Sequence, residues 1–458
     1  MSCLRIVSFL CVCACLLSSR SVIATDRPNI VVIMADDLGY GDLSCYGASK
    51  ISTPNCDRLA KEGRRFTDAH SPSAVCSPTR FGLLTGTYPW RGNRVPRHLH
   101  ASEPLVIRDG EATIASLLKA AGYATGCVGK WHLGAQRQNP IDWNQPLRPG
   151  PNDVGFDEYF GVINSHNQAP FVWVENDRII DRGPGEVIEV EGNTKQTKGR
   201  RTRIEEEGEE ILSAKAVNFI ERHKDHPFFL YYPTSAVHLP LTPAAEQRGK
   251  SQAGLYGDYV QEFDWAVGRV LDALDRLKLT DRTLVIVTSD NGGRLAATEF
   301  GHRADGPLRG QKATIYEGGH RVAFLVRWPG KVAAGTTSDE TICHVDMMAT
   351  LCAATGISLP EQAGPDSWNV LPAFIGEKYK APPREATICV SQNVKEFSIR
   401  QGPWKLIVPA AADQDKELYH LGDDLAESRN LVSEQPEIVE RLSKLLAKYK
   451  AEGRSRPR

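Results

Sequence analysis

The sequence predicts an α/β fold: a large, mostly parallel sheet flanked by helices, followed by a small antiparallel subdomain. Two features predict the large sheet. Residues 29–34 (NIVVIM) and 283–288 (TLVIVT) are continuous apolar runs, typical of strands buried on both faces, and amphipathic helical segments separate such runs. A third feature predicts the subdomain: after about residue 384, short strands alternate with turn residues, which indicates antiparallel pairing.

The elements follow one another in a regular order. Residues 113–121 predict a helix that ends at Gly122, and a strand follows at 124–128. Because strands and helices alternate, the connections are of the βαβ type, and ligands are expected outside the carboxyl ends of the strands. The other expected elements are helices at 211–223, 255–277 and 437–449, and strands at 228–232, 321–327, 387–391, 396–400 and 404–408.

Residues 1–24 predict a signal peptide. Arg5 precedes a twelve-residue apolar run, and Ala24 ends the segment with a small residue. No run is long enough to cross a bilayer, so no transmembrane segment is expected. We therefore expect a periplasmic or secreted protein, with a catalytic domain at 25–383 and a C-terminal subdomain at 384–458. A weak lipoprotein-like box at 12–15 leaves a lipid-anchored form as the minor alternative.

Charge and cysteine content exclude several classes of protein. The 55 lysines and arginines balance 56 acids, so no nucleic-acid partner is expected. The basic stretch 195–203 is read as a solvated loop in preference to a polyanion clamp. Four of the 11 cysteines leave with the signal peptide, and no CxxC pair remains. Export permits disulfides, but seven remaining cysteines are an odd number, so at least one thiol is free, modified or paired with another molecule.

Acidic clusters follow two of the predicted strands. Asp36 and Asp37 come after the first strand, and Asp290 and Asn291 come after the strand at 283–288. Each cluster alone is better explained by helix caps and Asx-turns. Since the carboxyl ends of parallel strands meet at one edge of a sheet, the two clusters together predict an all-oxygen site for Ca²⁺ or Mg²⁺.

Cys76 lies in the segment 74–80 (AVCSPTR). Pro78 suits the first turn of a helix, which places Cys76 near a helix N-terminus, where the pKa of a thiol is lowered. A lone cysteine is more often core filling or a disulfide partner. Here the pattern Cys-x-Pro-x-Arg, followed by Thr85 and Gly86, resembles the signature of the type I sulfatases.

Other segments extend this resemblance over nearly all of residues 28–430. Residues 122–125 and 129–134 (GKWHLG) resemble the second signature of the family. The remaining matches are Asp36, Asp37, Asp290, Asn291, His238, Lys312 and, more loosely, Ser165.

The resemblance implies an alkaline-phosphatase-like sulfatase fold and hydrolysis of sulfate esters, such as those of sulfated carbohydrates. It implies that a formylglycine-generating enzyme oxidises Cys76 to formylglycine. The aldehyde hydrates, and one hydroxyl, bound to the metal, attacks sulfur. The metal, Ca²⁺ with Mg²⁺ as the alternative, is expected to be bound by Asp36, Asp37, Asp290, Asn291 and residue 76.

The resemblance also implies roles for the cationic and histidine residues. Arg80, Lys130 and Lys312 would neutralise the ester oxygens, and the two lysines and Ser165 would contact substrate. His238 would protonate the leaving alcohol, and His132 would take a proton from the second hydroxyl. Preplaced cations of this kind stabilise charge that develops in the transition state. Converting Cys76 leaves six cysteines that could pair.

Two other functions remain open at this point. One is a phosphate-ester or phosphonate hydrolase of the same fold, although such enzymes more often use serine or threonine and two metals. The other is an inactive, sulfatase-like carbohydrate-binding protein, in which some of these residues would be missing. The segment 88–98 mixes aromatic and cationic residues that suit contact with an anionic sugar, and a plain surface loop is nearly as good an explanation.

Overall fold

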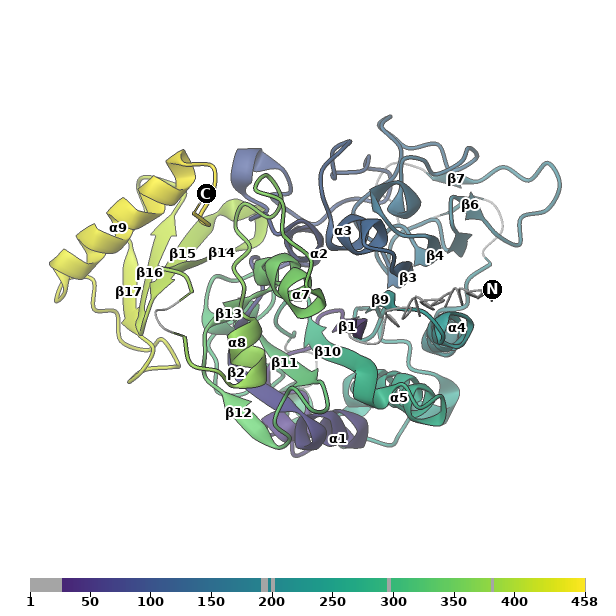
Figure 1. Ribbon diagram of the computed structural model, residues 1–458. Helices are drawn as coiled ribbons and strands as arrows, with labels where there is room; N and C mark the ends of the chain where they lie inside the picture. Colours follow the sequence, from purple (N-terminus) through teal and green to yellow (C-terminus); the bar gives the residue numbers. More distant parts are fainter. Residues whose placement is uncertain (1–26, 191–196, 199–201, 295–297, 380–382, 458) are drawn as a thin grey trace, which may run out of the picture.

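A large mixed sheet forms the centre of the computed structural model (Figure 1), which describes residues 27–190, 197–198, 202–294, 298–379 and 383–457. The strand order is β12-β2-β11-β10-β1-β9-β3-β4-β5-β6, with β13 paired to β2. The strands are β1 (Asn29–Ala35), β2 (Arg64–His70), β3 (Ala124–Lys130), β4 (Glu158–Val162), β5 (Val174–Glu175), β6 (Arg178–Ile179), β9 (Phe228–Pro233), β10 (Thr283–Ser289), β11 (Arg321–Arg327), β12 (Thr336–Ser338) and β13 (Ile342–Cys343).

Five central strands, β10, β1, β9, β3 and β4, are parallel, as the apolar runs predict. Side chains of β1 alternate between two hydrophobic clusters, with Ile30, Val32 and Met34 in one and Val31, Ile33 and Ala35 in the other. A strand whose two faces are both buried needs no polar alternation, which explains its continuous apolar sequence.

Helices cover both faces of the sheet (Figure 1). Buried residues of α2 (Cys76–Thr85), α3 (Ile114–Ala120), α7 (Met347–Thr355) and α8 (Leu371–Ile375) belong to one cluster. Those of α1 (Pro54–Glu62), α4 (Gly208–His223) and α5 (Gly254–Arg276) belong to the other. The predicted helix at 113–121 is α3, and Thr113 caps it, since its hydroxyl accepts from Ser116 N–H at 3.0 Å.

One strand runs against the expected direction. The segment at 321–327 is β11, but it pairs antiparallel with both β10 and β2. Among its described residues, the connection from β10 contains one 3-10 turn (Thr298–Phe300) and the four-residue helix α6 (Glu317–His320). A parallel return usually crosses one face of the sheet through a longer helix, and the described part of this connection has none.

The C-terminal part is a four-stranded antiparallel sheet, as predicted, with one strand more than the sequence indicated. Its order is β14 (Thr387–Val390), β15 (Glu396–Gln401), β16 (Trp404–Pro409) and β17 (Glu417–His420). Helix α9 (Pro436–Ala451) packs on β15 and β16. A bridge between Ser73 and Val390 joins this sheet to the segment before α2. The boundary at residue 384 stays a prediction.

The structure bears on the expectations for the cysteines and for the N-terminal and basic segments. All seven described cysteines are free thiols, so none of the six that could pair after conversion of Cys76 does so here. The predicted signal peptide and most of the basic stretch 195–203 lie outside the described residues. Where the chain is described, we find no helix that is both long and apolar enough to cross a membrane.

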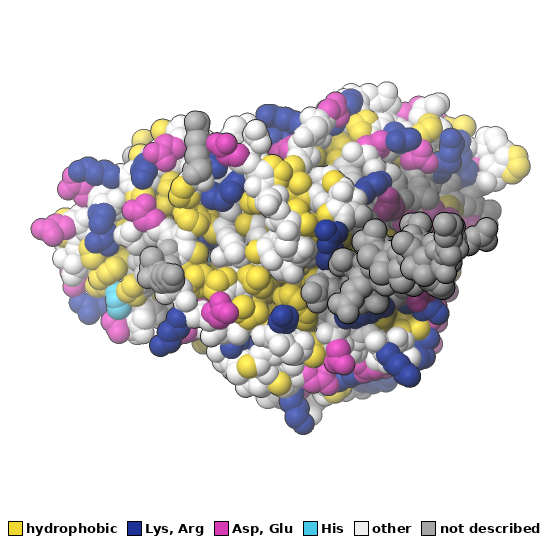
Figure 2. Space-filling view, in the orientation of Figure 1, with side chains coloured by type: hydrophobic (Ala, Val, Ile, Leu, Met, Phe, Trp, Pro, Cys, Tyr) yellow, Lys and Arg dark blue, Asp and Glu magenta, His cyan; other side chains and the backbone are white. Residues whose placement is uncertain are grey.

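On the face in Figure 2, basic and acidic side chains are interspersed, in keeping with the balanced composition. A separate ribbon pairs β7 (Glu189–Val190) with β8 (Thr197–Lys198).

Candidate active site

The ends of β1 and β10 bring the two acidic clusters together. Because Ala35 pairs with Ser289 in parallel register, the residues that follow each strand lie side by side. The backbone N–H of Asp37 donates to Oδ1 of Asp290 at 3.1 Å. The side-chain amide of Asn291 donates to Oδ1 of Asp37 at 2.9 Å. Asp36, Asp37, Asp290 and Asn291 are all buried.

Three basic residues are paired with these carboxylates. Arg80 donates through Nη2 and Nε to one oxygen of Asp290, at 2.6 and 3.1 Å. The ammonium of Lys130 lies 2.6 Å from Oδ2 of Asp36. The ammonium of Lys312 contacts Oδ1 of Asp37. These cations come from α2, from the end of β3 and from the loop before α6, so the fold assembles the cluster from distant segments.

The oxygen atoms of this cluster fit a hard divalent cation. Oδ1 of Asp36 and Oδ1 of Asn291 are buried and accept no hydrogen bond from any described residue. Buried polar atoms of this kind are costly unless a partner satisfies them. Burial and the neighbouring Asp36 raise the pKa of Asp290 to about 7, which indicates that the carboxylates lack compensating positive charge. Carboxylate and amide oxygens suit Ca²⁺ or Mg²⁺.

The other two carboxylates are held ionised. Burial alone would raise the pKa of Asp37, but Lys312 and His238 outweigh it and lower that pKa to about 2. Burial opposes ionisation of Asp36 in the same way, and Lys130, His238 and Arg80 together hold its pKa well below the usual range. The cations therefore keep the carboxylates of Asp36 and Asp37 charged.

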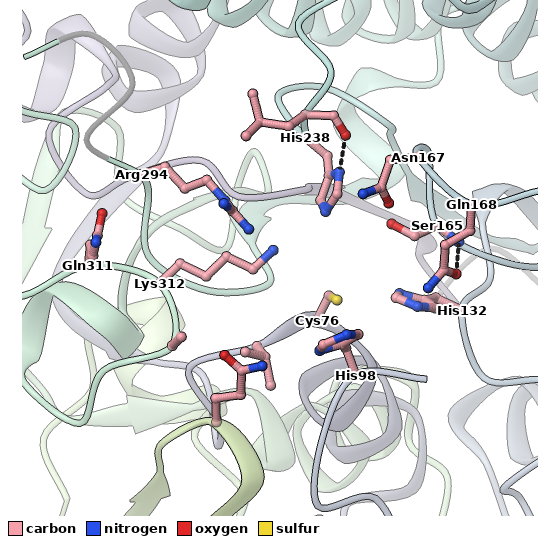
Figure 3. Close-up of a pocket in the computed structure, with 14 residues that line it drawn as sticks. Cys76, His98, His132, Ser165, Asn167, Gln168, His238, Arg294, Gln311 and Lys312 are labelled. Carbon is pink, nitrogen blue, oxygen red and sulfur yellow. Dashed lines mark hydrogen bonds between the residues drawn. The ribbon is translucent and has the colours of Figure 1, made fainter. Parts of the chain in front are cut away.

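Cys76 is the first residue of α2, as the position of Pro78 predicts. Figure 3 shows its sulfur between Lys312, His238, His132 and His98. The expectation of a lowered thiol pKa is wrong: burial raises the pKa of Cys76, and Lys130 and Lys312 only partly oppose that effect. The nearby negative charges of Asp36 and Asp290 raise the pKa of the thiol further.

The two predicted proton-transfer residues have defined tautomers. Nε2 of His132 lies 3.0 Å from the carbonyl of Leu99, which can only accept, so Nδ1 carries the lone pair and has no described partner. Nδ1 of His238 donates to the carbonyl of Leu239 at 2.6 Å, and its Nε2 lies 3.7 Å from Oδ2 of Asp37. Burial lowers the pKa of His238 to about 4 and that of His132 well below its usual value.

A cavity of about 500 Å³ opens over Cys76, and most of the predicted catalytic side chains line it. Ser165 lines it, and its buried hydroxyl has no hydrogen-bond partner among the described residues. Asp36, Asp37, Arg80, Lys130, Asp290 and Asn291 lie beneath the cavity floor and do not line it. Polar lining residues that the sequence did not single out are Asn167, Gln168, Arg294, Gln311 and Gln392.

Of these lining residues, Arg294 could have been predicted from the sequence and Gln392 could not. Arg294 follows the strand-end cluster closely, and its Nε lies 3.3 Å from Oδ2 of Asp37, so its place in the chain was a usable signal. Gln392 lies on the C-terminal subdomain, and its backbone N–H donates to Ala313 at 3.1 Å. Only the docking of the subdomain brings Gln392 to the cavity, and no local pattern predicts that.

The interpretation of residues 88–98 as a sugar-contacting loop is wrong for all but one of its aromatic and cationic residues. Tyr88 and Trp90 are buried in the core of the C-terminal subdomain. Arg91 pairs with Asp366 at 2.6 Å, and Arg94 and Arg97 pair with Glu111 and Glu103. Only His98 from this segment lines the cavity. Each of these arginines is already paired with an acidic side chain, and Arg91 and Arg94 line a pocket other than the catalytic cavity.

A cavity over a buried cluster of carboxylates, basic residues and a helix-terminal cysteine defines a hydrolase of anionic esters. Comparison with known proteins specifies the ester. A family model described as sulfatase matches residues 28–357, and one described as N-sulphoglucosamine sulphohydrolase, C-terminal, matches residues 310–452. The chain belongs to the sulfatase family and is a sulfuric ester hydrolase, as the sequence motifs indicate.

Relatives match along nearly the whole chain. It is 38% identical over 484 residues to N-acetylgalactosamine-6-O-sulfatase of Bacteroides thetaiotaomicron, covering 93% of this chain and 94% of that protein. It is 34% identical to human arylsulfatase A, covering 85% and 76%. A structure from work on metabolism of multiple glycosaminoglycans by B. thetaiotaomicron superimposes with a TM-score of 0.87 at 36% identity, covering 93% of this chain and 99% of that one.

A phosphonate monoester hydrolase of Agrobacterium radiobacter also superimposes, with a TM-score of 0.65 at 18% identity, covering 93% of this chain and 96% of that one. This likeness shows the alkaline-phosphatase-like fold alone. The family is associated with a bound metal and with formylglycine.

Proposed function

We propose that this sulfatase removes sulfate from sulfated amino sugars of the glycosaminoglycan type, with 6-O-sulfated N-acetylgalactosamine as the first candidate substrate. The 38% identity to a bacterial N-acetylgalactosamine-6-O-sulfatase over almost the whole of both chains supports this substrate. The observation that carries the catalytic part is the position of Cys76 at the floor of the cavity, above the oxygen cluster. We further propose export to the periplasm or the exterior, and maturation by a formylglycine-generating enzyme.

In this proposal Asp36, Asp37, Asp290 and Asn291 bind Ca²⁺ with residue 76, and Mg²⁺ is the alternative ion. The ion supplies Lewis-acid stabilisation of negative charge next to residue 76. Arg80 holds Asp290 from the protein side with two hydrogen bonds, and Lys130 holds Asp36 with one. These contacts orient each carboxylate so that its second oxygen is available to the ion.

Lys312 and Lys130 orient and neutralise the sulfate group. Cys76, His238 and Lys312 line the cavity, and Lys130 is buried outside its lining, near enough to lower the pKa of Cys76. A sulfate ester carries its charge on non-bridging oxygens, so fixed ammonium groups at this point favour the transition state. Formylglycine at position 76 supplies a hydrated aldehyde, and hence two hydroxyls where the thiol has a single reactive group.

The two histidines have complementary proton-transfer roles. The lone pair on Nδ1 of His132 is free to accept a proton from the hydrated residue 76. Nε2 of His238 lies 3.7 Å from Oδ2 of Asp37, and in the protonated ring it would donate its proton to the leaving sugar oxygen. Burial keeps His238 neutral in the free site, and the negative charge of a bound sulfate favours its protonated form.

The test is a substrate panel with matured protein. We expect release of sulfate from N-acetylgalactosamine-6-sulfate, little from the 4-sulfate, and less turnover of an aryl phosphate than of an aryl sulfate. Turnover of the 4-sulfate in preference to the 6-sulfate would overturn the proposed substrate and leave the sulfatase assignment intact. Chelation and Asp290→Ala should each abolish turnover, and Ca²⁺ or Mg²⁺, but not Zn²⁺, should restore the chelated enzyme.

A further inference from the structure

One side of the catalytic cavity is formed by residues 165–168, called here the wall segment. Ser165, Asn167 and Gln168 line the cavity, and Figure 3 shows them together on one side of it. The remaining residue, His166, is 1% exposed and does not line the cavity. The wall segment belongs to no helix or strand, so contacts from other parts of the chain must fix its position.

Arg203 holds His166 with both branches of its guanidinium group. Nη2 of Arg203 donates to the backbone carbonyl of His166 at 2.7 Å, and Nη1 lies 3.1 Å from the ring Nδ1. The guanidinium carbon also lies over the ring of Phe171, 5.5 Å from its centroid. Arg203 is the last residue of the basic stretch 195–203, and it is only 3% exposed. The expectation of a solvated loop is therefore wrong for this residue.

The contacts of the His166 ring fix the direction of its hydrogen bonds. A guanidinium group can only donate, so Nδ1 of His166 accepts from Arg203. Burial and the charge of Arg203 hold the pKa of His166 well below its usual value, so the ring is neutral and Nε2 carries its one proton. Nε2 lies 3.0 Å from Oγ1 of Thr242 and therefore donates to this hydroxyl.

Thr242 lies on the loop that carries His238, the proposed donor of a proton to the leaving alcohol. This loop follows β9, and His238 and Leu239 in it line the cavity. The hydrogen bond from His166 to Thr242 therefore joins the wall segment to the side of the cavity that contains the proposed acid.

The other end of the wall segment is held independently of His166. The side-chain amide of Gln168 donates to the carbonyl of Leu99 at 3.0 Å, and its Oε1 accepts the backbone N–H of Ser165 at 3.0 Å. The same carbonyl of Leu99 lies 3.0 Å from Nε2 of His132. Loss of the contact between His166 and Thr242 should therefore leave the surroundings of His132 in place.

We propose that Arg203 and His166 are positioning residues for the sugar part of the substrate, because they hold the wall segment in place against the loop of His238. Neither residue lines the cavity, so both act through the residues that do. The hydroxyl of Ser165 and the amides of Asn167 and Gln168 suit the hydroxyl groups of a sugar. This inference rests on the proposed function, since it requires a saccharide sulfate as substrate.

The experiment compares two substrates in matured variants. One is the saccharide sulfate that the parent enzyme hydrolyses fastest, and the other is nitrophenyl sulfate, which has no sugar to contact the wall segment. Thr242→Val removes the acceptor hydroxyl with little change in shape, and Arg203→Lys keeps the charge without the two-point contact. We expect each variant to lower kcat/KM for the saccharide by at least about tenfold, and for nitrophenyl sulfate by less than about threefold. Most of the loss should appear in KM, since contacts to the sugar are made in the bound substrate as well as in the transition state.

Two further variants serve as controls. Thr242→Ser keeps the hydroxyl and should retain the parent kcat/KM for the saccharide. Arg64→Lys changes another buried arginine, which donates to the carbonyl of Ala373 at 2.8 Å and to the hydroxyl of Thr336 at 2.9 Å and does not line the cavity. This variant should lower the melting temperature and leave the ratio of the two activities unchanged.

Equal losses on both substrates in Thr242→Val, or an unchanged kcat/KM for the saccharide in that variant, would overturn the positioning role and leave the proposed function intact. A parent enzyme that hydrolyses nitrophenyl sulfate and no saccharide sulfate would overturn the proposed substrate class, and this inference with it.

Discussion

Two groups of buried charges in this molecule have similar residues but differ in how completely their oxygen atoms are hydrogen-bonded. In the catalytic cluster, Asp36, Asp37 and Asp290 face Arg80, Lys130 and Lys312 beneath a cavity. At the subdomain interface, Arg91 donates twice to Asp366, at 2.6 Å each, and donates to the carbonyl of Tyr449 at 2.8 Å. Asp366 also accepts from the backbone of Tyr88 and Ser455.

The difference lies in what remains unpaired. The interface carboxylate has its hydrogen bonds filled from the protein, and the ring of Trp90 lies 4.6 Å from the Arg91 guanidinium. The catalytic cluster retains buried oxygens without a described donor, on Asp36 and Asn291, next to the cavity. Burial and charge alone therefore do not distinguish a functional cluster from a structural one. What distinguishes the functional cluster is buried oxygens without a hydrogen-bond donor next to a cavity. Changes in the catalytic cluster should therefore reduce activity, whereas changes in the Arg91–Asp366 cluster should reduce stability.

The largest expected effect is at Cys76. In a host that does not convert serine to formylglycine, Cys76→Ser keeps one hydroxyl beside the proposed metal ligands, and we expect it to attack sulfur once. Serine lacks the second hydroxyl, so the sulfated serine should accumulate. Mass spectrometry should show a gain of about 80 Da on that peptide, with a burst of one product equivalent per enzyme.

Cys76→Ala is the matched control and should show neither the adduct nor the burst. Its melting temperature should stay close to that of the parent, because the thiol has no structural partner comparable to those of Arg91. Steady turnover by the unmodified serine variant would mean that the adduct is broken down by water, as in a phosphatase-like mechanism.

The effect of His238→Ala should depend on the leaving group. A sugar alkoxide needs a proton and a nitrophenolate does not, so we expect about a 10²–10⁴-fold loss on sugar sulfates and a much smaller loss on nitrophenyl sulfate. His98→Ala is the control, because His98 lines the same cavity and has no assigned proton transfer. Equal losses of His238→Ala on both substrates would assign this histidine to sulfate binding.

At the interface, Arg91→Met should reduce stability with little change in the turnover of folded enzyme. Removing the cation leaves Asp366 buried without its charge partner, a change that typically costs about 3–5 kcal/mol in free energy of unfolding. Arg97→Met is the control, since its pair with Glu103 is partly exposed, with side chains at 35% and 21%, and should cost less than about 1 kcal/mol. Denaturant unfolding measures both. A larger loss of kcat than of stability in Arg91→Met would mean that this pair acts on the catalytic site.

The same comparison explains which parts of the molecule were predictable from sequence. The strands at 29–34 and 283–288 and the helix at 255–277 agree with β1, β10 and α5 to within about two residues, because buried parallel strands and amphipathic helices leave strong periodic patterns. The strand-end acids converge as expected because register follows from parallel pairing.

Features that depend on distant contacts were not predictable. Trp90 and Arg91 suit a sugar-binding loop by composition, and only the packing of the subdomain shows that they are core residues. The antiparallel direction of β11 depends on the lack of a crossover helix among the described residues before it, and the apolar run itself is the same for either direction. The raised pKa of Cys76 depends on burial, which the helix position alone does not reveal.

The smallest expected effect concerns Glu209, a buried residue of α4 that supports the loop carrying His238. Its Oε1 accepts the backbone N–H groups of Ser235 and Ala236, at 2.7 and 3.0 Å. Burial outweighs these hydrogen bonds and raises the pKa of Glu209 to about 7. A carboxyl whose pKa is raised in the folded state favours folding when protonated, so its contribution to stability declines as the pH rises from about 4.5 to 7.

Glu209→Gln removes this ionisation and keeps an oxygen that can accept both N–H groups. Relative to the parent protein, the variant should therefore become more stable by about 3 kcal/mol as the pH rises across that interval, with no further change above it. Glu210→Gln, an exposed neighbour on the same helix, serves as the control for a change of net charge. Denaturant unfolding at pH 4.5, 6 and 7.5 measures the difference. A constant difference between Glu209→Gln and the parent at all three values would mean that Glu209 stays ionised, and that the hydrogen bonds from Ser235 and Ala236 outweigh the cost of burying its charge.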